Sequence, residues 1–167
     1  RELDQACART GRTSSDLARD ALRRQLALLR FERVRRRALP LAVRPAHRRA
    51  ENRSKGIGNM TQILVVDDEV GIRELLSEIL EDEGYLVRLA ENAGQARELR
   101  TQGRPDLVLL DIWMPDTDGI TLLKEWASSG LLTMPVVMMS GHGTIDTAVE
   151  ATRIGAYDFL EKPIALQ

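Results

Sequence analysis

The hydrophobic and polar positions from residue 62 onward alternate between two periods. Short, almost entirely apolar runs rich in β-branched residues recur, and QILVV at 62–66 is the first. A run of this kind is typical of a strand that is buried on both faces of a parallel sheet. Between the runs, apolar residues recur every three or four positions, which is the helical period. The pattern therefore predicts strands that alternate with helices.

Five strands and four helices follow from this alternation. The first helix covers residues 70–84, where Gly84 is placed to end it. We expect further strands at 85–90, 106–111, 135–140 and 157–162, and further helices at 93–103, 120–130 and 144–155. Strands that alternate with helices imply right-handed crossovers and one open sheet. The predicted fold class is α/β, a five-stranded parallel doubly wound sheet.

Polar residues stand at the end of several predicted strands. The first strand runs into Asp67 and Asp68, the third ends in Asp111, the fourth in Ser140 and the fifth in Lys162. Open parallel sheets bind ligands at the carboxyl ends of their strands. We therefore expect these five side chains to converge on one rim of the sheet.

Three carboxylates at this rim require a positive partner. Two carboxylates about 4 Å apart repel each other by about 4 kcal/mol at an effective dielectric constant near 20. Mg²⁺ suits a site that offers two or three carboxylates and leaves room for water and phosphate oxygens, and Lys162 adds a fixed positive charge. A cation and an ammonium beside a carboxylate favour phosphoryl transfer to that carboxylate.

Four motifs then resemble one family. VVDDE, LLDIWMPDTDG, VVMMSGHG and GAYDFLEKP occur in the order and spacing of the receiver domain of bacterial two-component response regulators. The residues in these motifs are most similar to those of the NtrX and NtrC group. The resemblance covers about residues 61–167 and implies the flavodoxin-like receiver fold.

The resemblance implies a role for each rim residue. Asp111 would accept a phosphoryl group from a sensor histidine kinase, with catalytic help from Lys162 and Ser140. Asp67, Asp68 and Asp111 would hold Mg²⁺ together with the backbone carbonyl of Trp113.

Conformational switching is implied as well. Ser140 would reorient toward the phosphoryl group, and Phe159 would swing inward with it. The family also has a cis peptide bond at the position between Lys162 and Pro163. These expectations describe a phosphorylatable switch that regulates transcription and is not an enzyme.

The partners in the parent protein follow from the same resemblance. A downstream ATPase and a DNA-binding domain would carry the output, and a homodimer is left open. The family has a further helix after Lys162, of which only IALQ remains here. We therefore regard 60–167 as a receiver domain that is incomplete at its C-terminal end, and expect an apolar patch where that helix would pack.

Charge separates the first 59 residues from the rest. Residues 1–59 contain 16 basic and 6 acidic residues, whereas residues 60–167 contain 8 basic and 19 acidic ones. TSSD at 13–16 resembles a capping box and begins an apolar stripe. We predict a basic helical segment at 1–39 and a disordered linker at 40–59, which is rich in Arg, Ala, Pro and Gly.

Three interpretations of this basic third stay open. It could be a solvated arm, which we favour, or a surface that binds nucleic-acid phosphates. Its helical part loosely resembles ribbon-helix-helix antitoxin repressors, without the strand with which those proteins bind DNA. A third hypothesis makes residues 1–59 an upstream gene remnant read in frame, with Met60 as the native start.

Two alternative functions complete the expectations. A Mg²⁺-dependent aspartyl phosphohydrolase of the haloacid-dehalogenase type would have a second Asp two residues after the nucleophile, where Trp113 stands. The other alternative is a DNA-binding module that uses the basic arm. The single cysteine and the absence of an apolar run of about 18 residues favour a cytoplasmic protein without a membrane span.

Overall fold

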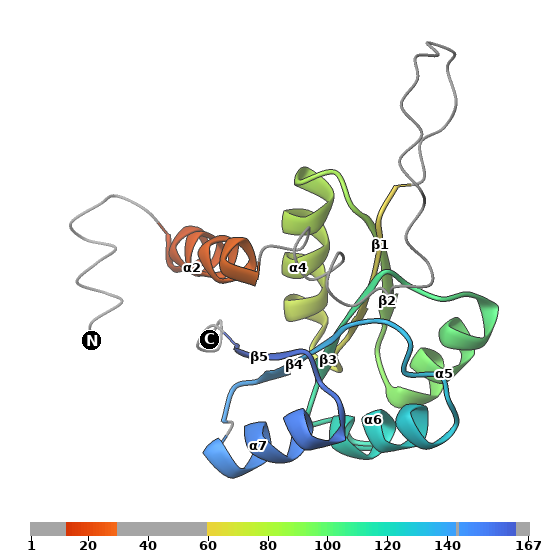
Figure 1. Ribbon diagram of the computed structural model, residues 1–167. Coiled ribbons are helices and arrows are strands. Elements are labelled where there is room, and N and C mark those ends of the chain that lie inside the picture. Colours follow the sequence, from red (N-terminus) through yellow and green to blue (C-terminus); the bar gives the residue numbers. More distant parts are fainter. Residues whose placement is uncertain (1–12, 30–59, 143, 163–167) are drawn as a thin grey trace, which may run out of the picture.

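The computed structural model describes residues 13–29, 60–142 and 144–162. One parallel sheet forms the centre, with the strand order β2-β1-β3-β4-β5. Figure 1 shows the helices in two layers, one on each side of this sheet. The predicted α/β doubly wound fold is confirmed.

The alternation of strands and helices follows the predicted order. The strands are β1 (Gln62–Val66), β2 (Leu86–Ala90), β3 (Leu107–Asp111), β4 (Val136–Ser140) and β5 (Asp158–Glu161). The helices are α2 (Ser14–Leu29), α4 (Val70–Asp82), α5 (Ala93–Gln102), α6 (Gly119–Ser128) and α7 (Ile145–Ile154). Each predicted element of the sheet region is present, with ends that differ from the prediction by at most two residues.

The two faces of the sheet bury different residues of the same strands. Leu64 and Val66 of β1 belong to a cluster on one face, with residues of α5, α6 and α7. Ile63 and Val65 belong to the cluster on the other face, which α4 covers with five buried side chains. Because successive strand residues point to opposite faces, an all-apolar strand requires both layers.

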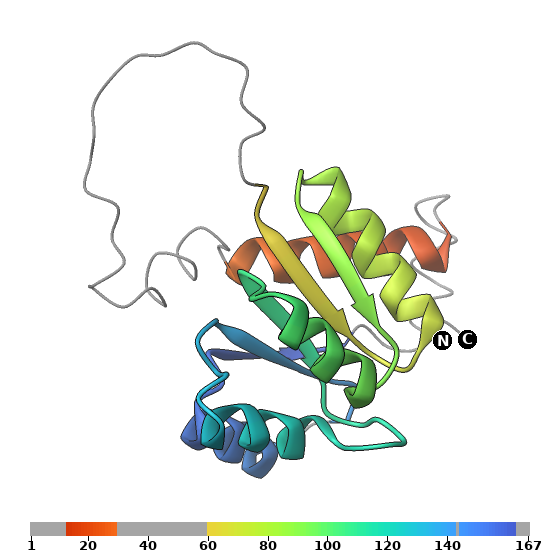
Figure 2. The same ribbon diagram turned by 90° about the vertical axis from the view of Figure 1, so that its right-hand side faces the viewer.

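Helix α2 lies beside α4 on the same face (Figures 1 and 2). Its first turn is a reciprocal capping box, in which the Thr13 N–H donates to Asp16 Oδ2 (3.0 Å) and the Asp16 N–H donates to Thr13 Oγ1 (3.2 Å). Leu22 and Leu26 are buried in the cluster under α4. Ion pairs from Arg19 to Glu78 and from Arg23 to Asp82 flank this contact.

This contact changes two expectations about the ends of the receiver region. The apolar patch expected on this face is absent among the described residues, since Val137, Met139 and Leu160 are buried in the cluster that also contains Leu22 and Leu26. The packing also counts against the hypothesis that the helix is an unrelated remnant. The proposed domain boundaries stay a prediction.

Some expectations lie outside the described residues. They are the helical parts of 1–39 beyond α2, the linker at 40–59 and the cis bond before Pro163. No helix in the described part of the chain is long and apolar enough to cross a membrane.

Candidate phosphoacceptor site

The acidic residues meet where the strand order reverses. Strand β1 lies between β2 and β3, so its carboxyl end adjoins the ends of both. Asp67 and Asp68 follow β1, and Asp111 ends β3. Ligand atoms of these three carboxylates lie within 4.8 Å of one another, as the sequence led us to expect. A crevice at such a reversal is the usual binding position in open α/β sheets.

Lys162 lies within the same cluster of acidic residues. Its Nζ lies 2.8 Å from Asp67 Oδ2, 3.0 Å from Glu69 Oε1 and 3.2 Å from Asp111 Oδ2. The lysine side chain is buried, and so are the carboxylates of Asp67 and Asp111. The ammonium group therefore faces two buried carboxylates and the exposed carboxylate of Glu69. Charge interactions among the buried groups are stronger than in water.

Burial and the neighbouring charges together change the pKa values of the site. Burial raises the pKa of Asp111 to about 6, and the charge of Asp67 adds to this increase, whereas Lys162 and the backbone N–H of Trp113 oppose it. Burial also raises the pKa of Asp67, and the contact with Lys162 opposes this only in part. For Lys162, burial alone would lower the pKa, but contacts with Asp67, Asp111 and Glu69 outweigh it and raise the pKa.

The donor set fits a hard divalent cation. Asp111 Oδ1 is buried and accepts no hydrogen bond from the described residues, whereas Asp67 Oδ2 lies 2.8 Å from the Lys162 ammonium. Asp68 is exposed at the mouth of the cluster. A buried carboxylate oxygen without a donor, with the exposed carboxylate of Asp68 nearby, matches the ligands that Mg²⁺ prefers.

The loop after Asp111 returns tightly to the sheet. The Gly119 N–H donates to the Ile112 carbonyl at 2.8 Å. A Cβ atom at Gly119 would lie 2.1 Å from the Asp111 carbonyl oxygen, so only glycine fits there. Trp113 lies in this loop with its side chain 61% exposed, so the indole is not part of the core.

Ser140 and Phe159 lie at neighbouring strands. Ser140 ends β4, is fully buried, and its Oγ accepts a hydrogen bond from the His142 N–H at 3.1 Å. Phe159 of β5 is partly buried against the core on the α5, α6 and α7 face. Strands β4 and β5 pair in parallel, with Ser140 opposite Glu161. The two switch candidates are thus on adjacent strands, and Ser140 shares the rim with the carboxylates.

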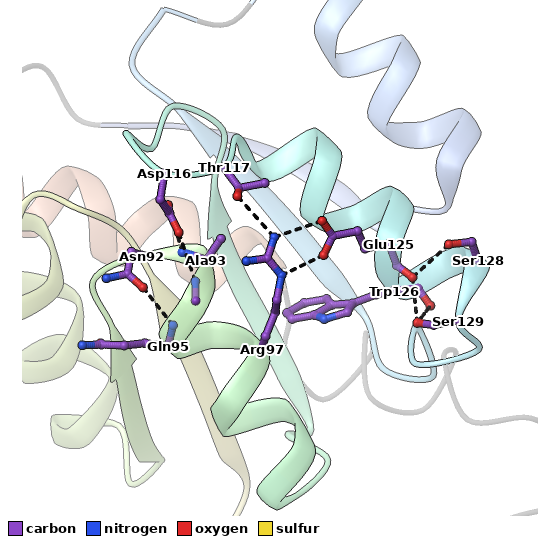
Figure 3. Close-up of polar contacts among 11 residues, drawn as sticks. Asn92, Ala93, Gln95, Arg97, Asp116, Thr117, Glu125, Trp126, Ser128 and Ser129 are labelled. Carbon is purple, nitrogen blue, oxygen red and sulfur yellow. Dashed lines mark hydrogen bonds and ion pairs between the residues drawn. The ribbon is translucent and has the colours of Figure 1, made fainter.

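Several residues around the site were missed by the sequence reasoning. Glu69 pairs with Lys162, and the Arg73 Nη1 donates to the Asp67 carbonyl at 2.6 Å. Glu69 directly follows Asp67 and Asp68 in the motif VVDDE, and this position is the sequence signal that could have identified it. Arg97 and Asp116 connect α5 to the loop after Asp111 (Figure 3). No sequence signal connects Arg97 or Asp116 to its hydrogen-bond partner, because each partner is about 20 positions away along the chain.

The fold and this cluster of three acids with a lysine define the class of protein. The sequence profile of the response regulator receiver domain matches residues 63–167, which is more than half of the chain. The chain therefore belongs to the response regulator receiver domain family, and within it to the NtrX/NtrC type of two-component regulator.

Individual relatives agree with this assignment. NtrX, the nitrogen assimilation regulatory protein of Azorhizobium caulinodans, is 50% identical over 103 residues, which are 60% of this chain and 22% of that protein. The receiver domain of NtrX from Brucella abortus is 51% identical, covers 62% of this chain and 87% of that one, and superposes with a TM-score of 0.56. The beryllofluoride-activated NtrC4 receiver domain dimer is 40% identical, covers 64% and 88%, and has a TM-score of 0.58. The chain thus spans about a fifth of the length of the full-length NtrX relative.

Proposed function

We propose that Asp111 is the phosphoacceptor of this receiver domain and that Asp67, Asp68, Asp111 and the Trp113 carbonyl together hold Mg²⁺. The observation that carries the proposal is the meeting of three carboxylates with one buried lysine at the reversal of the strand order. A bound Mg²⁺ would offset the charge that develops on the phosphoryl oxygens.

The chemistry at Asp111 is a transfer of one phosphoryl group. A carboxylate oxygen of Asp111 forms a bond to phosphorus while the bond from phosphorus to the donor breaks. The donor is the phosphohistidine of a sensor kinase, whose imidazole leaves with the bonding electrons and takes a proton from solvent. Asp111 must be ionised to attack, and with a pKa of about 6 it is mostly ionised at neutral pH.

Lys162 and Ser140 act on the group once it is transferred. Lys162 lies 3.2 Å from Asp111 Oδ2, so its ammonium is close enough to pair with a phosphoryl oxygen on that carboxylate. Ser140 exchanges its hydrogen bond with the His142 N–H for one to the phosphoryl group, and Phe159 follows from the adjacent strand. A phosphoryl group adds about 1.5 to 2 negative charges, which biases two pre-existing conformations.

The shift between the two conformations alters the surface formed by α7 and the start of β5, which a partner then recognises. Ile145, Val149 and Tyr157 are 84%, 42% and 37% exposed. Ile145 and Val149 are one helical turn apart and therefore share a side of α7. Exposed apolar side chains grouped in this way favour association with a partner, and a second receiver domain would suit them. The related NtrC4 receiver domain is a dimer in its activated state.

The parent protein would use this switch to control transcription. The ATPase and DNA-binding domains proposed for it belong to the parent and not to the described residues. We place the protein in the cytoplasm, where a sensor kinase would donate its phosphoryl group. The phosphohydrolase alternative is less favoured, because Trp113 occupies the position where such an enzyme has its second Asp.

Chemical trapping of the acceptor tests the proposal. The chain is incubated with acetyl phosphate and Mg²⁺, reduced with sodium borohydride, digested and mapped by mass spectrometry. Borohydride converts an aspartyl phosphate to homoserine, so the change is expected at Asp111 alone. A conversion at Asp67 or Asp68 in place of Asp111 would overturn the assignment of the acceptor.

A further inference from the structure

The ligand proposed at Trp113 is a backbone carbonyl in the loop between β3 and α6. The residues 112–118 have no regular secondary structure, and their ends are held by the hydrogen bond between the Gly119 N–H and the Ile112 carbonyl. A carbonyl ligand moves with the backbone and has no rotamer to adjust. Anything that fixes the middle of this loop therefore fixes the position of that oxygen.

Asp116 attaches the middle of the loop to the beginning of α5. Its Oδ1 accepts a hydrogen bond from the Ala93 N–H at 3.2 Å, and its Oδ2 accepts one from the Gly94 N–H at 3.1 Å. The first N–H groups of a helix have no partner within the helix, and a negative charge is favourable there. Asn92 accepts from the next one, the Gln95 N–H, at 2.8 Å. Asp116 thus supplies acceptors that α5 itself lacks.

Arg97 makes a second attachment one turn further along α5. Its Nη2 donates to Thr117 Oγ1 at 3.2 Å, directly beside Asp116 in the loop. The same guanidinium binds both carboxylate oxygens of Glu125 in α6, at 2.8 and 2.9 Å. Figure 3 shows Asp116 and Thr117 facing α5 from the loop, with Glu125 on the other side of Arg97. Helix α5 therefore holds both the loop and the helix that follows it.

We propose that Asp116 is a positioning residue, which with the support of Arg97 and Thr117 holds the loop on α5 and so presets the Trp113 carbonyl for the cation. The inference deepens the proposed function and rests on the cation site proposed there. Both carboxylate oxygens of Asp116 are already bonded to N–H groups of α5, so we assign Asp116 no direct contact with the cation. Loss of groups that orient metal ligands typically weakens metal affinity by about 10- to 100-fold.

Magnesium affinity of the full chain measures this role without any turnover. Trp113 is 61% exposed beside the site, whereas Trp126 is 2% exposed in the core, so a Mg²⁺-dependent change in tryptophan fluorescence reports mainly on Trp113. We expect Asp116→Ala to raise the dissociation constant about tenfold. Asp116→Asn keeps one acceptor without the charge, so its Mg²⁺ dissociation constant should lie between those of Asp116→Ala and the wild type. A general loss of folding would not produce this order.

The matched control removes the same charge elsewhere. Asp146 stands in the first turn of α7, exposed and outside the loop and α5, and Asp146→Ala should leave Mg²⁺ affinity unchanged. Hydrogen exchange supplies the direct check on the attachment. The amides of Ala93 and Gly94 should exchange faster in Asp116→Ala, because their acceptor is gone.

The outcomes separate this inference from the proposed function. Wild-type Mg²⁺ affinity in both Asp116 variants would overturn the positioning role and leave the phosphoacceptor site intact. Failure of the wild-type chain to bind Mg²⁺ would overturn the cation site and this inference together. With acetyl phosphate as donor, the positioning role also predicts a higher half-saturating Mg²⁺ concentration in Asp116→Ala and an unchanged maximal rate.

Discussion

Neutralising Asp111 should stabilise the fold in the absence of metal. Its pKa of about 6 in the folded chain stands against 3.8 as its ordinary value, because burial and Asp67 disfavour the charged form. Each unit of difference corresponds to 1.36 kcal/mol, so the ionised carboxylate costs the folded state on the order of 3 kcal/mol at pH 7. Asp111→Asn removes this cost, and Lys162 keeps Asp67 and Glu69 as partners.

The sign of the pH dependence follows from the same difference. Between the two pKa values the folded wild type binds more protons than the unfolded chain, so it gains stability relative to Asp111→Asn as the pH falls. The excess in the free energy of unfolding of Asp111→Asn over the wild type should be full at pH 7 to 8. It should shrink below about pH 6 and vanish below pH 3.8. Added Mg²⁺ should also shrink it, because the cation binds only the folded wild type tightly.

Urea unfolding at several pH values, followed by circular dichroism, measures this effect. The control is Asp146→Asn, which removes an exposed charge and should change the free energy of unfolding by less than about 0.5 kcal/mol. An Asp111→Asn variant that is no more stable than the wild type at pH 7 without Mg²⁺ would refute the reasoning. Lys162 would then fully compensate the buried charge.

Three further predictions concern the cation, the loop and α2. Mg²⁺ affinity, titrated by tryptophan fluorescence, should rise between pH 5 and 7, because the proton on Asp111 competes with the cation; a constant affinity would contradict this. Gly119→Ala should lower the free energy of unfolding by about 1–3 kcal/mol through its clash with the Asp111 carbonyl, whereas Gly71→Ala, with open space around it, should not. Leu22→Ala should cost about 2–5 kcal/mol in urea unfolding, since the side chain is fully buried; unchanged stability would contradict a stabilising contact between α2 and the sheet.

The sequence predicts most of the fold because its strands are unusually uniform. Mainly apolar runs that alternate with helical periods allow few architectures other than a parallel sheet covered on both faces. The topology then brings strand ends together, so the order of strands and helices alone predicts Asp67, Asp111 and Lys162 on one rim. The family motifs add the roles of these residues, which the geometry alone would leave open.

Contacts between distant segments could not be predicted in the same way. Asp118 immediately precedes a helix, and its role as the cap of α6 is a local feature. Asp116 is only two residues away, yet it binds the beginning of a helix more than 20 positions earlier, which depends on how α5 packs. The docking of Leu22 and Leu26 is equally non-local, because an amphipathic stripe does not specify which surface it covers.

Phosphorylation of the chain tests the central claim most directly. Intact mass is measured after incubation with acetyl phosphate, with and without Mg²⁺, for the wild type and for Asp111→Asn, beside circular dichroism spectra of both. The account predicts a gain of one phosphoryl group that requires Mg²⁺ and is absent in the variant. A folded wild-type chain that gains no phosphoryl group, or a variant that gains one equally, would contradict it.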